Sequence, residues 1–124
     1  MKKTTLVLMT LALFLFGIQN ANAHAQLSLS LPTKNQTVKV LPSIVWLEFD
    51  GDLLSFRDKQ IHRLTVTNAK KVRVDIGGPI VGVDRISTKL KSGLPSGKYL
   101  VSYRIVSEDG HPVAGSYSFT YKPK

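Results

Sequence analysis

The chain has 124 residues, of which 43% are hydrophobic and 20% are charged, which is enough for one small domain. Lys and Arg outnumber Asp and Glu by 17 to 8, and cysteine is absent, so disulfides are excluded and a packed core must stabilise the fold. The basic residues are scattered without a run of five or six, which predicts a solvated basic surface and argues against a nucleic-acid partner.

Residues 1–23 are predicted to be a secretory signal peptide. Lys2 and Lys3 precede an apolar run of about a dozen residues, and Ala21-Asn22-Ala23 has the small-x-small pattern at which cleavage occurs. The alternative is a membrane anchor, but the run is shorter than the roughly 20 residues that span a bilayer. Cleavage between Ala23 and His24 would release an exported domain, residues 24–124, that does not span the membrane.

The mature chain alternates apolar and polar residues with period two, and no stretch has a convincing helical pattern. About seven strands are expected, and the clearest cover residues 27–31, 44–49, 64–67, 71–76, 99–106 and 113–121. Turn residues separate them, including Gly77-Gly78-Pro79. Residues 53–60 are predicted as a loop or a short helical turn, and residues 80–90 as one strand or two. This spacing predicts an all-β, immunoglobulin-like Greek-key sandwich or barrel, with Trp46 in its core.

The mature chain has three histidines, His24, His62 and His111. Cleavage before His24 would place its α-amine and its Nδ1 atom one short linkage apart, so both could chelate one metal ion in a six-membered ring. The α-amine loses its proton to a metal near neutral pH far more readily than a lysine does. The alternative is an ordinary frayed terminus without a ligand.

Asp109 and His111 stand two residues apart between the last two strong strands, so they can project from the same side of an extended loop. The alternative is a plain Asp-Gly hairpin turn. Together with His24 they would supply three nitrogens and one oxygen, a set that suits tetragonal Cu(II). That combination requires the first strand to begin beside the loop. Ser107 lacks a recognisable activating context, so a serine hydrolase is not indicated.

Three segments carry a family resemblance. The mature chain would begin His24-Ala25-x-Leu27, the second strand reads Pro42-x-x-Val45-x-Leu47-x-Phe49, and the last loop reads Ser107-x-Asp109-Gly110-His111-Pro112-Val113-x-Gly115. In these features the chain resembles the CopC family of periplasmic copper-binding, copper resistance proteins. The resemblance covers essentially all of residues 24–124.

The resemblance implies a Greek-key β-sandwich or barrel that binds one Cu(II) ion through the amine and ring of His24, Asp109 and His111. Some members add an acidic residue where Asp50 stands, although Asp50 also suits a solvated turn. The methionine-rich Cu(I) loop of the best-known members is absent, since Met1 and Met9 both lie in the predicted signal peptide. We therefore expect a Cu(II)-only protein in which His62 is an exposed or cross-strand residue.

The implied role is copper sequestration, resistance or delivery to a membrane partner such as a CopD-like transporter of the inner membrane. We expect a monomer and no enzymatic activity. One alternative is a histidine-brace copper oxidative enzyme, which the short chain and the carboxylate ligand disfavour. Another is a metal-free adhesion-type sandwich, for which the sequence offers no aromatic platform.

Overall fold

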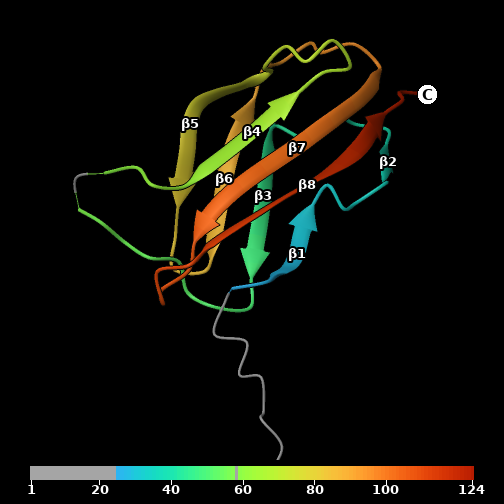
Figure 1. Ribbon diagram of the computed structural model, residues 1–124. Coiled ribbons are helices and arrows are strands. Elements are labelled where there is room, and N and C mark those ends of the chain that lie inside the picture. The colour runs from blue at the N-terminus through green and yellow to red at the C-terminus, as the bar shows by residue number, and fades with distance from the viewer. Residues whose placement is uncertain (1–24, 58) are drawn as a thin grey trace, which may run out of the picture.

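The computed structural model describes residues 25–57 and 59–124, so the predicted signal peptide and His24 lie outside the described residues. The described chain forms two packed four-stranded sheets, and it confirms the predicted all-β sandwich (Figure 1). The strands are β1 (Leu27–Leu31), β2 (Thr37–Val38), β3 (Ile44–Phe49), β4 (Arg63–Thr67), β5 (Asp75–Val81), β6 (Arg85–Leu90), β7 (Gly97–Val106) and β8 (Pro112–Tyr121).

The strand order is β1-β3-β6-β5 in one sheet and β2-β8-β7-β4 in the other. All neighbouring strands run antiparallel except β2, which lies parallel to β8. The long β7–β8 hairpin pairs Gly97 with Tyr121 at one end and Val106 with Pro112 at the other. This hairpin therefore carries the 107–111 turn at its tip.

The core lies between the sheets and follows the period-two alternation. In β3, Val45, Leu47 and Phe49 are buried, and they pack with buried residues of the opposite sheet such as Val101. Trp46 was expected in the core, and this prediction is wrong. The alternation turns Trp46 to the outer face of β3, where the guanidinium of Arg85 lies 4.2 Å from the ring centroid.

The course of β5 differs from the prediction. Gly77 and Gly78 were expected in a turn, but they lie inside β5, with φ angles of +80° and +71° and a register shift against β6 between Ile76 and Ile80. Glycine accommodates such an irregularity because it has no Cβ. Residues 80–90 consequently divide between two strands, β5 and β6, and the eighth strand, β2, was too short to predict.

The loops gather at two ends of the sandwich. We call one the His111 end, which comprises residues 25–26, 50–57, 59–62, 82–84 and 107–111. We call the other the Lys70 end, which comprises residues 39–43, 68–74, 91–96 and 122–124. In Figure 1 the Lys70 end is at the top, beside the C-terminus, and β1 begins at the lower, His111 end. Within residues 25–57 and 59–124, no helix is long and apolar enough to cross a bilayer.

Candidate metal centre

The 107–111 turn is held together by its own hydrogen bonds. Ser107 is buried, with 1% of its surface exposed, and its hydroxyl donates to Oδ1 of Asp109. The backbone N–H of His111 donates to the same oxygen at 3.1 Å. The backbone N–H of Gly110 donates to the Ser107 carbonyl at 2.8 Å, and Gly110 adopts φ +87°, a conformation that favours glycine. The turn therefore fixes the position of the Asp109 carboxylate.

The structure brings Asp109 and His111 together, as their spacing predicts. Nδ1 of His111 lies 3.1 Å from Oδ2 of Asp109. The pKa of Asp109 lies well below its usual range, chiefly because the Ser107 hydroxyl donates to the carboxylate and also because of the His111 backbone and ring. An ionised carboxylate and an imidazole are thus held side by side at the edge of the molecule.

The first described residues of the chain lie against the turn that follows β3. Ala25 is buried, and a Cβ atom on Gly51 would come within 3.3 Å of the Ala25 Cα. The backbone N–H of Gln26 donates to Oδ1 of Asp50 at 2.6 Å, and the Asp50 N–H donates to the Gln26 carbonyl at 2.9 Å. The 50–52 turn thereby anchors the start of the described chain.

The same turn is joined to the 107–111 turn. Leu53 forms an isolated β-bridge with Ser107, and the Glu108 N–H donates to the Asp52 carbonyl at 3.0 Å. Residue 25, the 50–52 turn and the 107–111 turn are therefore neighbours at the His111 end. The predicted ligand His24 directly precedes Ala25 in the sequence and lies outside the described residues. The residues that are described contain no group of three or more His, Cys, Asp or Glu side chains suited to a metal ion.

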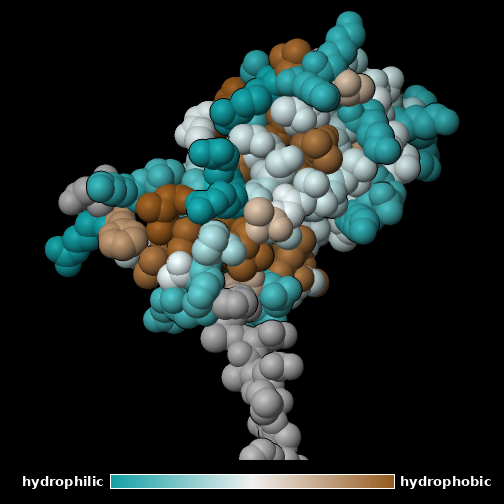
Figure 2. Space-filling model, in the orientation of Figure 1, coloured by the Kyte–Doolittle hydropathy of each residue, from teal (hydrophilic) through white to brown (hydrophobic). Residues whose placement is uncertain are grey.

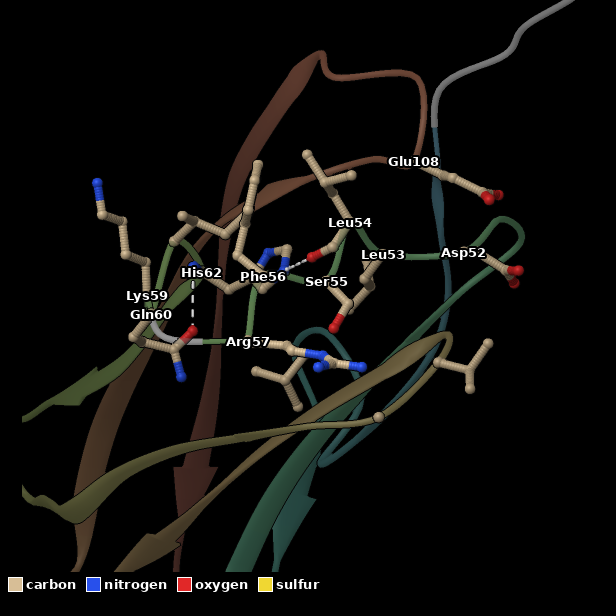
Figure 3. A pocket seen from close by; sticks show the side chains of 14 residues that line it. Asp52, Leu53, Leu54, Ser55, Phe56, Arg57, Lys59, Gln60, His62 and Glu108 are labelled. Carbon is tan, nitrogen blue, oxygen red and sulfur yellow. Dashed lines mark hydrogen bonds between the residues drawn. The ribbon is translucent and has the colours of Figure 1, made fainter.

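His62 was expected to be exposed or cross-strand, and the expectation of exposure is wrong, since only 5% of its surface is accessible. Its Nε2 lies 2.7 Å from the carbonyl oxygen of Leu54 (Figure 3). Its Nδ1 accepts the Val106 N–H at 3.1 Å. A backbone N–H can only donate, so Nδ1 is the acceptor and Nε2 carries the proton. His62 therefore links the 54–61 loop to the end of β7, with both ring nitrogens engaged.

A groove of about 960 Å³ adjoins these turns and was not predicted from the sequence. It is formed by residues of the 52–62 loop, by residues 81–83 and by Glu108 (Figure 3). Phe56 and Val83 are 58% and 70% exposed, and Figure 2 shows apolar side chains gathered on this part of the surface. Asp52 and Glu108, whose turns touch, lie on the side of the groove nearest the 107–111 turn.

Ser107 is the residue at this centre whose role sequence reasoning missed. It was considered only as a nucleophile, whereas its buried hydroxyl holds the Asp109 carboxylate. A serine two residues before an aspartate in a tight turn is a signal of local side-chain hydrogen bonding that could have indicated this role.

The chain is similar in sequence and in structure to known proteins. The model of the family described as the CopC domain matches residues 27–122. The structure of CopC from Methylosinus trichosporium OB3b is similar, with a TM-score of 0.70 and 25% identity over 81% of this chain and 95% of that one. The structure of PcoC, a methionine-rich copper resistance protein from Escherichia coli, has a TM-score of 0.61 and 30% identity over 80% of this chain and 99% of that one.

Two curated proteins also match in sequence. The copper transport protein CutJ of Bacillus subtilis is 32% identical over 94 residues, which cover 73% of this chain and 17% of CutJ. Copper resistance protein C of Escherichia coli is 55% identical over 29 residues, which cover 23% of each chain. This chain thus spans less than a quarter of each curated relative that it matches. Both relatives are named for copper transport or resistance rather than for catalysis.

Proposed function

Because the chain belongs to the CopC family, we propose that it binds one Cu(II) ion at the His111 end, for copper sequestration, resistance or delivery. The observation that carries this proposal is the position of the 50–52 turn. It is hydrogen-bonded to Gln26 on one side and to Glu108 on the other. This arrangement supports the requirement that the mature N-terminus begin beside the 107–111 turn.

The proposed ligands are the α-amine and ring of His24, a carboxylate oxygen of Asp109 and the ring of His111. They would supply three nitrogens and one oxygen, which favours a tetragonal Cu(II) ion. Asp109 is suited to this role because its carboxylate is ionised at neutral pH and is held in position by the Ser107 hydroxyl and the His111 N–H. We assign Asp50 to anchoring Gln26, because Oδ1 of Asp50 already accepts that N–H.

The electrostatics of the His111 end favour a cation. Five exposed carboxylates are found in its described loops, and they belong to Asp50, Asp52, Asp84, Glu108 and Asp109. Two basic side chains, Arg57 and Lys59, stand in the same described loops. An excess of negative charge around a site raises the local concentration of cations and speeds their association.

We propose that the protein binds Cu(II) and has no separate site for Cu(I). PcoC is described as methionine-rich, whereas this chain has only Met1 and Met9, both within the predicted signal peptide. Soft thioether ligands are what Cu(I) prefers. His62 does not replace them, because both of its ring nitrogens are engaged by the backbone.

The proposed setting is the periplasm, after removal of residues 1–23. The proposed partner for delivery is a CopD-like copper transporter of the inner membrane, with which a monomer of this protein would exchange its ion. Both curated relatives support a role in copper handling through their names, which refer to copper transport and copper resistance.

The decisive experiment is Cu(II) titration of the protein that begins at His24, followed by electron paramagnetic resonance. We expect one ion per chain and a tetragonal signal with about three nitrogen couplings. A second protein with one methionine before His24 should bind Cu(II) weaker by orders of magnitude, because the chelating amine is lost. Equal affinity with and without the extra residue would remove the N-terminus from the site.

Two histidine variants complete the test. His111→Ala should reduce Cu(II) affinity sharply, whereas His62→Gln should leave the stoichiometry and the spectrum unchanged. Full binding by His111→Ala would show that the 107–111 turn is not part of the site.

A further inference from the structure

The basic residues that appear scattered in the sequence come together at the Lys70 end. Backbone hydrogen bonds of 2.9 Å connect parts of this end: the Lys91 N–H donates to the Val74 carbonyl, and the Leu90 N–H donates to the Ser43 carbonyl. The Lys122 N–H donates to the carbonyl of Val38, the last residue of β2, also at 2.9 Å. The exposed lysines of these loops are Lys39, Lys70, Lys71, Lys91, Lys122 and Lys124. We call these six residues the lysine patch.

No acidic side chain in the loops of the Lys70 end neutralises the positive charge of the lysine patch. The loops of the Lys70 end, all of them described, contain no Asp or Glu. Arg73 of the same end is not counted in the patch because it is paired with the buried Asp75, at 2.6 Å between Nη2 and Oδ2. The acidic loops lie at the His111 end, and β7, with ten residues, separates the two ends by about 30 Å. This exceeds the screening length of about 8 Å at physiological salt, so the two charged ends act independently.

Apolar side chains project among the lysines. Val40 is 81% exposed and follows Lys39, and Val72 is 55% exposed and follows Lys71. Figure 2 shows hydrophilic side chains projecting over this end with apolar ones among them. Protruding apolar side chains surrounded by Lys are characteristic of protein surfaces that lie in the headgroup region of a membrane.

A shallow pocket lies in the same surface. It has a volume of about 260 Å³ and is formed by residues 68–70 and 95–99, which belong to two different loops and the start of β7. Lys70 and Lys98 line it, together with the hydroxyl-bearing Ser96. Lysine and serine are residue types whose side chains can bind the phosphate of a lipid headgroup.

We propose that the lysine patch docks the protein on an anionic phospholipid bilayer. Val40 and Val72 would enter the headgroup region, and the pocket beside Lys70 would accept a lipid phosphate. The strands would then hold the His111 end about 30 Å from the lipid surface, exposed to solvent. The patch shares no residue with the proposed copper site, so this inference stands or fails independently of that site.

The test is co-sedimentation of the protein that begins at His24 with phosphatidylcholine vesicles that contain 30% phosphatidylglycerol, and with pure phosphatidylcholine vesicles. We expect binding to the anionic vesicles alone, weakened by salt. Lys70→Gln/Lys71→Gln should weaken binding by about 25-fold, or about fivefold per charge. The matched control, Arg57→Gln/Lys59→Gln, removes the same charge from the His111 end and should change binding less than about twofold. If the two double variants lost the same amount of vesicle affinity, net charge alone would drive binding. That result would overturn the proposal that the lysine patch is the docking surface.

Apolar insertion is tested separately. Val72→Ala should weaken vesicle binding, whereas Val83→Ala should not, although Val83, at the His111 end, is the more exposed of the two valines, at 70% against 55%. Two results together would overturn the lipid assignment in favour of a soluble polyanion. They are equal binding of wild type and Val72→Ala to the vesicles, and binding of wild type to soluble heparin as tightly as to the vesicles. Urea denaturation of Lys70→Gln/Lys71→Gln should give the wild-type free energy of unfolding, which shows that the variant is folded.

Discussion

The buried hydroxyl of Ser107 donates a hydrogen bond to the carboxylate of Asp109, two residues further along the same turn. The His111 N–H donates to the same carboxylate. Asp109 is therefore oriented by the protein itself, as the proposed role of this residue as a copper ligand requires. Such prior orientation of a ligand by a neighbouring hydrogen bond raises metal affinity, because less has to be ordered on binding.

Ser107→Ala should weaken Cu(II) binding by about tenfold while leaving one ion per chain, because removal of a group that orients a ligand typically has an effect of this size. The pKa of Asp109 should move up toward its ordinary value in the same variant, since the Ser107 hydroxyl is the main cause of its lowering. Competition titrations and the NMR titration of Asp109 in the metal-free protein measure the two effects. Ser116→Ala, at an exposed serine of β8, is the control. Wild-type affinity in Ser107→Ala would contradict the orienting role.

Asp50→Ala should weaken Cu(II) binding by about tenfold without a change in the nitrogen couplings, because the variant releases the Gln26 N–H and loosens the start of the chain. Asp52→Ala removes the same charge from the same turn and should have a smaller effect. Equal effects of the two variants would point to electrostatic attraction alone. A changed spectrum in Asp50→Ala would instead make Asp50 a ligand.

His62→Ala should lower the free energy of unfolding by about 1–3 kcal/mol, because it leaves the Leu54 carbonyl and the Val106 N–H without their partner. His62→Gln should be less destabilising, since an amide can both donate and accept. Urea denaturation of the metal-free proteins gives the two values. If His62→Ala were as stable as wild type, the link between the 54–61 loop and β7 would contribute nothing to stability.

Arg73→Gln should destabilise the fold by about 2 kcal/mol at pH 7, a value reduced from that of a fully buried pair because Arg73 is 59% exposed. The side chain of Asp75 is fully buried, and burial alone would raise its pKa. The hydrogen bond and charge of Arg73 and the Val66 N–H instead bring that pKa below its ordinary value. Asp75 thus contributes stability above its unfolded-state pKa of about 4, and this contribution is lost as the pH falls through the lower folded-state value.

The difference in the free energy of unfolding between wild type and Arg73→Gln should therefore narrow as the pH falls through the lowered folded-state pKa of Asp75. Urea denaturation at a series of pH values measures it. Arg104→Gln, at an exposed arginine of β7, removes the same charge and should show no such pH dependence. If the difference in the free energy of unfolding between wild type and Arg73→Gln stayed constant down to pH 2, Asp75 would be excluded as its origin.

Sequence patterns were sufficient for the class of fold, because alternation in segments such as β4 reports directly which side chains are buried. They failed where a single strand departs from regularity. Gly77 and Gly78 have turn composition, yet pairing with β6 on either side keeps them within β5. Trp46 looked like a core residue because neighbouring apolar residues obscured the parity that turns it outward.

By itself the sequence determined the all-β class, the absence of disulfides and the pairing of Asp109 with His111, since all three depend on composition or on residues close together in the chain. Only the tertiary structure decided which distant residues meet. The 50–52 turn joins Gln26 to Glu108, His62 reaches Val106 across 44 positions, and lysines from separate loops gather at one end. Such contacts depend on strand order and register, and these are set by the packing of two whole sheets rather than by any local pattern.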